Sequence, residues 1–199
     1  PKWLKVSQVL DYVEAVHPRF ERKKAEDFLL TTDIPSKKRV KELSKGMVTQ
    51  LHLALVMAID VQLLVLDEPT LGLDIIYRKG FYDRLLNDYY DGNRTIIIST
   101  HQVEEIEVLL SHLIFIDRGK IVLNEMMSDL ADIYVEVLVD ADKIEKAEAL
   151  NPISTRRILG KTACTYESVP KGQLEALGDL HSPSVADFFV AKMKDIHHG

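Results

Sequence analysis

The stretch that decides the fold is Leu63-Leu64-Val65-Leu66-Asp67-Glu68-Pro69-Thr70, which runs directly into Leu71-Gly72-Leu73-Asp74. Four apolar residues are too few to cross a membrane, and the run is typical of a strand buried on both faces of a parallel sheet. Two adjacent carboxylates at its end are costly to remove from water, so they need a cation, hydrogen-bond donors or a reacting water. Mg²⁺ is the natural cation, because it binds carboxylates together with phosphate oxygens. For this run alone, an ordinary strand with a solvated tip is the alternative.

Two further segments make the interpretation specific. Residues 42–50 upstream read ELSKGMVTQ, and residues 96–101 downstream read IIISTH, a second apolar strand that ends in a histidine. In this order and at these spacings, the three segments resemble the signature motif, the Walker B strand with its D-loop, and the switch histidine of an ABC-type ATPase. The resemblance covers roughly residues 3–125. It implies an ATP-binding, ATP-hydrolysing subunit of an ABC transporter, similar to those of exporters.

The signature-like segment predicts a helix that begins at Ser44, with Leu43 and Val48 as a hydrophobic staple around this N-cap. Free backbone N–H groups and a glycine at such a helix end suit a phosphate, although an ordinary capped helix with a surface lysine is the alternative. The resemblance implies that Ser44, Lys45 and Gly46 bind the nucleotide held by a second ATP-binding subunit. The sequence departs from the common LSGGQ form at Lys45 and Met47, and neither change opposes anion binding.

The resemblance also assigns roles at the strand ends, and the chemistry it implies is phosphoryl transfer from ATP to water. Asp67 would orient the water shell of Mg²⁺, and Glu68 would polarise the attacking water. His101 would donate a hydrogen bond to the γ-phosphate. Asp74 would take part in nucleotide binding by coupling the two sites of a dimer. ATP and Mg²⁺ are therefore the expected cofactors.

The same residues predict how these groups come together. Apolar strands at 63–67 and 94–100 flank a segment at 76–90 with helical spacing, which is a β-α-β unit and implies a parallel sheet. Ligands bind outside the carboxyl ends of such strands, so Asp67, Glu68 and His101 should converge on one crevice. The expected fold class is α/β, a parallel-sheet fragment like that of P-loop NTPases and ABC ATPases, with a helical subdomain and a small α+β appendage.

One expected motif is missing from the chain. No G-x-x-x-x-G-K-[ST] string, the loop that cradles phosphates, occurs before residue 44. Gly160-Lys161-Thr162 has the right ending, but Thr155 stands where the first glycine is required, and the flanking residues predict a hairpin. We therefore expect the chain to begin partway through an ATPase domain. By itself it should bind ATP poorly and be inactive.

The chain divides into three expected parts. Residues 1–42 predict part of a helical subdomain, with two amphipathic helices followed by a connection whose Lys and Arg residues at 37–41 form an exposed, solvated surface, with a binding patch as the alternative. Residues 43–130 predict the ATPase core with the signature, the Walker B strand, the D-loop and the switch histidine. Residues 131–199 predict an α+β extension, in which the expected elements are a strand at 133–140, a helix at 143–150, a hairpin around Gly160, a helix at 172–180 and a final helix after Ser182-Pro183-Ser184.

Composition sets the outer limits. The 199 residues are 46% hydrophobic and 28% charged, with a formal net charge of −6, so the chain resembles a soluble globular protein with no electrostatic footprint for nucleic acid. No run approaches the length of a transmembrane helix, and the single Cys164 cannot form an internal disulfide. We expect a cytoplasmic protein, held at the inner face of the cell membrane through a transmembrane permease subunit and paired with a second ATP-binding subunit.

Two other classes of protein stay open. One is a soluble ABC-type ATPase that is not linked to transport, for which a basic surface or a duplicated cassette would be expected. The other is a non-hydrolysing interaction module that only completes the site of another subunit. The missing phosphate-binding loop favours this second alternative for the chain as it stands.

Overall fold

The computed structural model describes residues 1–198, with the side chains of Ala131 and 194–198 left out of the description. The chain forms two compact units, Pro1–His101 and Gln102–Gly199, and each is described by itself. Among the described residues, no helix is both long and apolar enough to cross a membrane. The observed division falls directly after His101. The three-part organisation expected from the sequence, 1–42, 43–130 and 131–199, stays a prediction.

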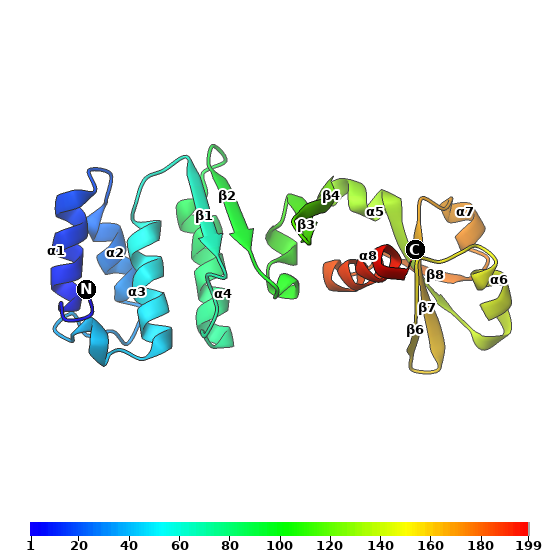
Figure 1. Ribbon diagram of the computed structural model, residues 1–199, viewed down its shortest axis with the longest axis horizontal. Helices are drawn as coiled ribbons and strands as arrows, with labels where there is room; N and C mark the ends of the chain where they lie inside the picture. The colour runs from blue at the N-terminus through cyan, green and yellow to red at the C-terminus, as the bar shows by residue number, and fades with distance from the viewer. Residues whose placement is uncertain (199) are drawn as a thin grey trace. The chain divides into compact units, whose positions relative to one another are not determined.

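The first unit combines a group of helices with a pair of strands (Figure 1). Its helices α1, α2 and α3 precede strand β1, and α4 connects β1 to β2 by way of a π-helical turn, η2. The elements are α1 (Val6–Val16), α2 (Arg22–Leu29), η1 (Val40–Glu42), α3 (Lys45–Met57), β1 (Leu63–Asp67), α4 (Ile75–Arg84), η2 (Leu85–Tyr89) and β2 (Thr95–Ser99). The two amphipathic helices predicted within residues 1–42 are therefore confirmed.

Strands β1 and β2 pair in parallel, which confirms the predicted β-α-β unit. Their register runs from Leu63 opposite Thr95 to Asp67 opposite Ser99, so the two strands end side by side. The expectation that β1 is buried on both faces is wrong for the described residues. Leu64 and Leu66 are buried, whereas the side chain of Val65 on the opposite face is 62% exposed. The described part of the chain packs against one face of this strand pair only.

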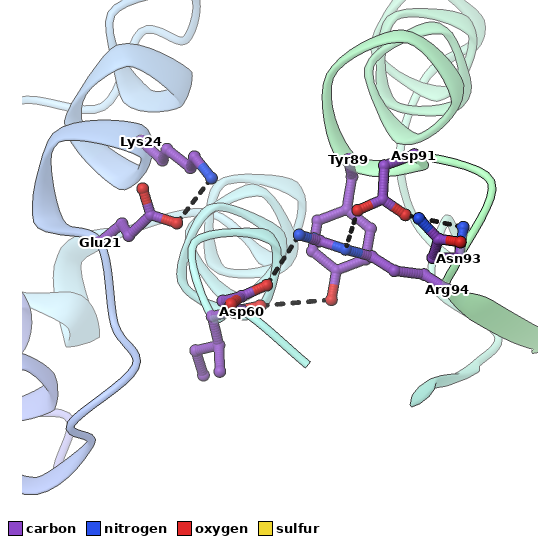
Figure 2. Close-up of polar contacts among 8 residues, drawn as sticks. Glu21, Lys24, Asp60, Tyr89, Asp91, Asn93 and Arg94 are labelled. Carbon is purple, nitrogen blue, oxygen red and sulfur yellow. Dashed lines mark hydrogen bonds and ion pairs between the residues drawn. The ribbon is translucent and has the colours of Figure 1, made fainter. Parts of the chain in front are cut away.

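An arginine joins the chain after α3 to the start of β2 (Figure 2). The Arg94 guanidinium contacts the carboxylates of Asp60 and Asp91 at 2.7 Å and 3.1 Å and lies 4.7 Å from the centre of the Tyr89 ring. The Tyr89 hydroxyl in turn donates to the Ile59 carbonyl at 3.2 Å, and burial raises the pKa of Tyr89. This cluster fixes the entrance of β2, at the end of the strand away from the predicted catalytic residues.

We predict that Arg94→Ala lowers the free energy of unfolding by about 1 to 2 kcal/mol, because two partly exposed ion pairs and one cation–π contact are lost together. Urea denaturation followed by circular dichroism measures the change. Lys79→Ala is the matched control, since Lys79 is an exposed cation of the same unit. An equal loss in both variants would show that the Arg94 cluster adds no stability.

The second unit begins with two short 3₁₀ turns and a hairpin. The elements are η3 (Val103–Glu105), η4 (Glu107–Leu109), β3 (His112–Asp117), β4 (Lys120–Met126) and α5 (Met127–Ile133). The C-terminal helix α8 (Val185–His198) packs its Phe188 ring against Phe115 of the hairpin and Tyr134, with ring centres 5.4 Å and 4.1 Å apart. The Ser184 hydroxyl accepts the Asp187 N–H at 3.1 Å, which caps this helix at its predicted start.

A four-stranded antiparallel sheet forms the rest of this unit. The elements are β5 (Tyr134–Val139), η5 (Ala141–Lys143), α6 (Ile144–Glu148), β6 (Ser154–Ile158), β7 (Lys161–Glu167), α7 (Lys171–Leu174) and β8 (Gly178–His181). The spatial order is β6-β7-β5-β8, and the sequence of elements is β-α-β-β-α-β, the split β-α-β arrangement. Valines of β5 pack with Cys164 and Tyr166 of β7 and with apolar residues of α6 and α7. Burial raises the pKa of the Cys164 thiol.

Two predictions about this sheet have opposite outcomes. Gly160 has φ +86° and forms the turn between β6 and β7, so Gly160-Lys161-Thr162 is part of a hairpin, as predicted, and not a phosphate-binding loop. The helix expected at 172–180 is wrong beyond Leu174, because the chain turns into β8 at Gly178. There the backbone approaches β5 so closely that a Cβ at position 178 would lie 2.2 Å from the Leu138 carbonyl oxygen.

We predict that Gly178→Ala destabilises the protein by about 2 to 3 kcal/mol, because the added methyl group meets backbone that cannot move aside. Gly172→Ala is the control, since a Cβ there would have no atom within 4 Å. Thermal unfolding should show a clear loss of stability for the first variant and none for the second. A Gly178→Ala protein as stable as the parent would mean that β8 can shift away from β5.

Candidate functional site

The candidate site begins where β1 and β2 end. The Ser99 hydroxyl donates a hydrogen bond to the Asp67 carboxylate, and the Glu68 N–H donates to the Ser99 carbonyl at 2.9 Å. Glu68 has φ +43°, a left-handed conformation that is strained for a residue with a Cβ and commonly marks functional sites. The chain therefore leaves the sheet sharply at Glu68 while it stays hydrogen-bonded to the neighbouring strand.

The Glu68 carboxylate contacts the two residues that follow β2. One of its oxygens accepts the His101 backbone N–H at 3.1 Å and lies 2.7 Å from the His101 Nδ1. The other accepts the Thr100 hydroxyl at 3.4 Å. The His101 side chain is 65% exposed and that of Glu68 is 32% exposed, so solvent and ligands can reach the pair. Asp67, Glu68 and His101 thus lie at the same end of the strand pair, as the sequence predicted.

The hydrogen bond between Glu68 and His101 decides which nitrogen of the imidazole is free. An ionised carboxylate only accepts, so Nδ1 carries the proton in this contact. In a neutral imidazole the Nε2 atom is then an acceptor, and it can donate to a phosphate only when the ring is doubly protonated. The pair can hold or move one proton at the ends of the two strands.

We predict that neutral His101 is the Nδ1-protonated tautomer in the folded chain, and that Glu68→Ala shifts it to the Nε2-protonated form. Nitrogen-15 chemical shifts of the His101 ring, recorded where the imidazole is neutral, distinguish the two forms. His52 is a built-in reference, because it is exposed and should be unaffected by the substitution. An Nε2-protonated His101 in the unsubstituted protein would contradict the proposed contact.

The predicted helix start at Ser44 is confirmed. The Ser44 hydroxyl accepts the Met47 N–H at 3.2 Å and caps α3, and both Ser44 and Lys45 are exposed to solvent. Gly46 permits a close approach, since a Cβ there would lie 3.3 Å from the Gly72 carbonyl oxygen. The N-terminus of α3 is thus packed against the loop that follows β1.

Asp74 caps the next helix. Its carboxylate accepts the N–H groups of Ile76 and Tyr77 at 3.0 Å and 3.1 Å, which holds the loop after β1 against the start of α4. The Tyr77 hydroxyl reaches Asp33 at 3.2 Å, so α4 is also tied to the segment that precedes α3. Sequence reasoning gave Asp74 a role between subunits, and its observed contacts are those of a helix cap within this chain.

The predicted residues therefore form two groups. Asp67, Glu68 and His101 lie at the ends of β1 and β2, and the residues of the second group lie around the N-termini of α3 and α4. The loop Pro69–Leu73 connects the groups, and within the described residues no hydrogen bond or ion pair joins a side chain of one group to a side chain of the other. The second group consists of Ser44, Lys45, Gly46 and Asp74.

Sequence reasoning missed two residues that support the first group. The hydroxyls of Ser99 and Thr100 donate to Asp67 and Glu68, respectively. Their signal was present, because both stand between an apolar strand and the histidine that follows it. Ser99 and Thr100 reach the two carboxylates only because β1 and β2 pair in this register. The register of a strand pair cannot be derived from one strand alone.

The first group could bind a divalent cation through the Asp67 carboxylate. The described residues contain no group of three side chains that could hold a metal by themselves. Asp67 is an exposed carboxylate whose other acceptor sites stay open beside the Ser99 bond. This fits Mg²⁺, which is commonly held through water by one or two carboxylates while phosphate oxygens complete its shell.

Comparison with known proteins places these features in context. The chain is 27% identical over 135 residues to the ABC transporter ATP-binding protein YtrB of Bacillus subtilis, covering 68% of this chain and 46% of that protein. It is 38% identical over 138 residues to the Nod factor export ATP-binding protein I of Rhizobium etli, covering 67% and 43%. No protein-family model matches the chain.

Solved structures give the same fold. The structure of an ATP-binding subunit of an ABC transporter matches with a TM-score of 0.60 at 18% identity, over 66% of this chain and 57% of that chain. The fold is therefore that of ABC ATPase domains, which are P-loop NTPases. The chain spans less than half the length of each of the two curated relatives named above.

Proposed function

We propose that this chain, whose homologues are ABC transporter ATP-binding proteins, is the part of an ATP-hydrolysing transporter subunit that carries the catalytic glutamate and histidine. The observation that carries this proposal is the contact between Glu68 and His101 at 2.7 Å, at the carboxyl ends of two parallel strands. Ligands of open α/β sheets bind outside these ends. A carboxylate paired with a histidine there is suited to proton handling during phosphoryl transfer.

Each residue of the first group has a distinct proposed role. Glu68 accepts a hydrogen bond from the attacking water and polarises it, and its contacts with Thr100 and His101 fix the carboxylate for this task. His101 contacts the γ-phosphate through Nε2 when the imidazole is protonated. Asp67, steadied by Ser99, holds a water of the Mg²⁺ shell. Bound Mg²⁺ would supply positive charge to the phosphate oxygens.

The second group is proposed to serve a nucleotide on another subunit. Ser44 and Lys45 are exposed at the N-terminus of α3, where free N–H groups and a lysine favour an anion. Asp74 then couples the two sites, because it caps α4 within the loop that begins at the catalytic carboxylates. Partners of this protein are a second ATP-binding subunit and a transmembrane permease, which holds it at the inner face of the membrane.

The 199 residues contain no G-x-x-x-x-G-K-[ST] string in a strand-to-helix setting. We therefore propose that they hydrolyse little or no ATP by themselves and act only together with a phosphate-binding loop. The non-hydrolysing module remains the second candidate for the isolated chain, and the same absence is what favours it. ATP turnover is thus a property to be measured on the assembled transporter.

We predict that Glu68→Gln in the assembled transporter lowers steady-state ATP hydrolysis at least about a hundredfold, because an amide cannot polarise the attacking water. ATP binding and the unfolding midpoint should change little, since the amide keeps the size of the side chain. Phosphate release measured at saturating ATP gives the rate.

Glu175→Gln is the matched control, because Glu175 is an exposed carboxylate in the second unit. It should hydrolyse ATP at the rate of the parent protein. If Glu68→Gln also kept the parent rate, Glu68 would not be the catalytic base. If neither the parent transporter nor its variants hydrolysed ATP, the non-hydrolysing alternative would replace the proposal.

A further inference from the structure

Two hydroxyl groups meet beneath the loop that follows β1. Thr70 belongs to this loop and is 2% exposed, and Tyr82 belongs to α4 and is 4% exposed. The Thr70 Oγ1 and the Tyr82 hydroxyl oxygen lie 3.2 Å apart and form a buried hydrogen bond. This bond therefore ties the loop to the body of α4.

Burial makes the contact restrictive. A hydroxyl that is removed from water without a partner costs free energy, so both groups favour the loop position at which they meet. The Tyr82 side of the contact is held in place, because its ring packs against the buried Phe81 ring with centres 5.1 Å apart. The position of Thr70, and with it that of the loop, is therefore set from α4.

The contact lies two residues along the chain from Glu68. The Leu71 N–H donates to the Glu68 carbonyl at 3.1 Å, which closes a turn around Thr70. On the other side, the Glu68 N–H donates to the Ser99 carbonyl at 2.9 Å. Glu68 has φ +43°, and a strained backbone of this kind persists only where the surrounding structure fixes it. The Glu68 backbone is thus held from two directions, by β2 and by α4.

We infer that Tyr82 is a positioning residue, which holds the Glu68 carboxylate against His101 through Thr70. Its effect on ATP hydrolysis rests on the proposed function, whereas its effect on the position of Glu68 rests on the described contacts alone. When the bond between the two hydroxyls is lost, the turn after β1 relaxes and the carboxylate leaves its 2.7 Å contact with the His101 Nδ1. A misplacement of about 1 Å, even by a substitution away from the chemistry, can slow an enzyme about a hundredfold.

A purely structural role for the bond is the alternative, and the two roles differ when both hydroxyls are removed. Replacing both partners of a buried hydrogen bond by apolar groups of the same shape can restore part of the stability that either single substitution loses. The position of the loop is not restored, because the bond that sets it is still missing. The double variant Thr70→Val, Tyr82→Phe therefore separates stability from position.

The His101 ring reports the position of Glu68 without any ATP. Nitrogen-15 chemical shifts of neutral His101 are recorded for the parent chain and for Tyr82→Phe. We expect the Nδ1-protonated form to give way to a mixture of tautomers, because Nδ1–H loses its fixed acceptor. Tyr90→Phe is the matched control, since Tyr90 belongs to the same unit and is 46% exposed, and its His101 spectrum should equal that of the parent.

ATP hydrolysis by the assembled transporter tests the consequence. Tyr82→Phe and Thr70→Val should each lower kcat about tenfold, because a loosely held carboxylate is oriented less often toward the attacking water. KM for ATP should stay the same, since both hydroxyls are buried. The double variant should recover part of the unfolding temperature while its kcat stays low. Thr70→Ser, which keeps a hydroxyl, should have the kcat of the parent.

Any of three outcomes would overturn the inference. These are an unchanged His101 spectrum in folded Tyr82→Phe, an equal change in Tyr90→Phe, or a double variant whose kcat returns to the parent value together with its stability. If Tyr82→Phe does not fold, Thr70→Val takes its place in the spectra, with Thr70→Ser as its control. A parent transporter that hydrolyses no ATP would contradict the proposed function instead, and the His101 spectra would still decide whether Tyr82 positions the Glu68 carboxylate.

Discussion

The parallel pairing of β1 with β2 is the constraint on which the functional part of this molecule depends. Because Asp67 lies opposite Ser99, the residues that follow each strand, Glu68 and His101, emerge at the same level and can touch. A shift of one residue would turn every side chain to the other face and separate the carboxylate from the imidazole. The Arg94 cluster contributes from the opposite end, since it fixes where β2 begins.

The loop after β1 connects the ends of the two strands to the N-termini of α3 and α4. It leaves the sheet at Glu68, passes Gly72 against the N-terminus of α3, and ends at Asp74 on the N-terminus of α4. The path of this loop depends on the left-handed backbone of Glu68, on the absence of a Cβ at Gly46, which lets the Gly72 carbonyl approach α3, and on the Asp74 helix cap. A movement of α3 relative to α4 would therefore be transmitted to Glu68 through a loop of five residues, Pro69–Leu73.

Much of this arrangement could be predicted from the sequence, because the deciding signals are local. Apolar runs that end in polar or charged residues predicted β1 and β2, Ser44 predicted the start of α3, and turn residues around Gly160 predicted a hairpin. What failed depends on contacts between distant segments. Which face of β1 is exposed depends on the segments that pack against the strand, and a short run cannot show this. Residues 178–181 form a strand only because they pair with the edge of β5. The left-handed turn at Glu68 and the tautomer of His101 likewise follow from tertiary hydrogen bonds.

The second unit contains a natural reporter of its own integrity. Cys164 is the sole thiol of the chain, lies wholly within the apolar side of the antiparallel sheet, and is less acidic than a free cysteine because of that burial. Alkylating reagents react with the thiolate, so the Cys164 thiol is unreactive while the sheet is intact. The rate of Cys164 alkylation then measures how often β7 separates from β6 and β5 by local unfolding, and no probe has to be introduced.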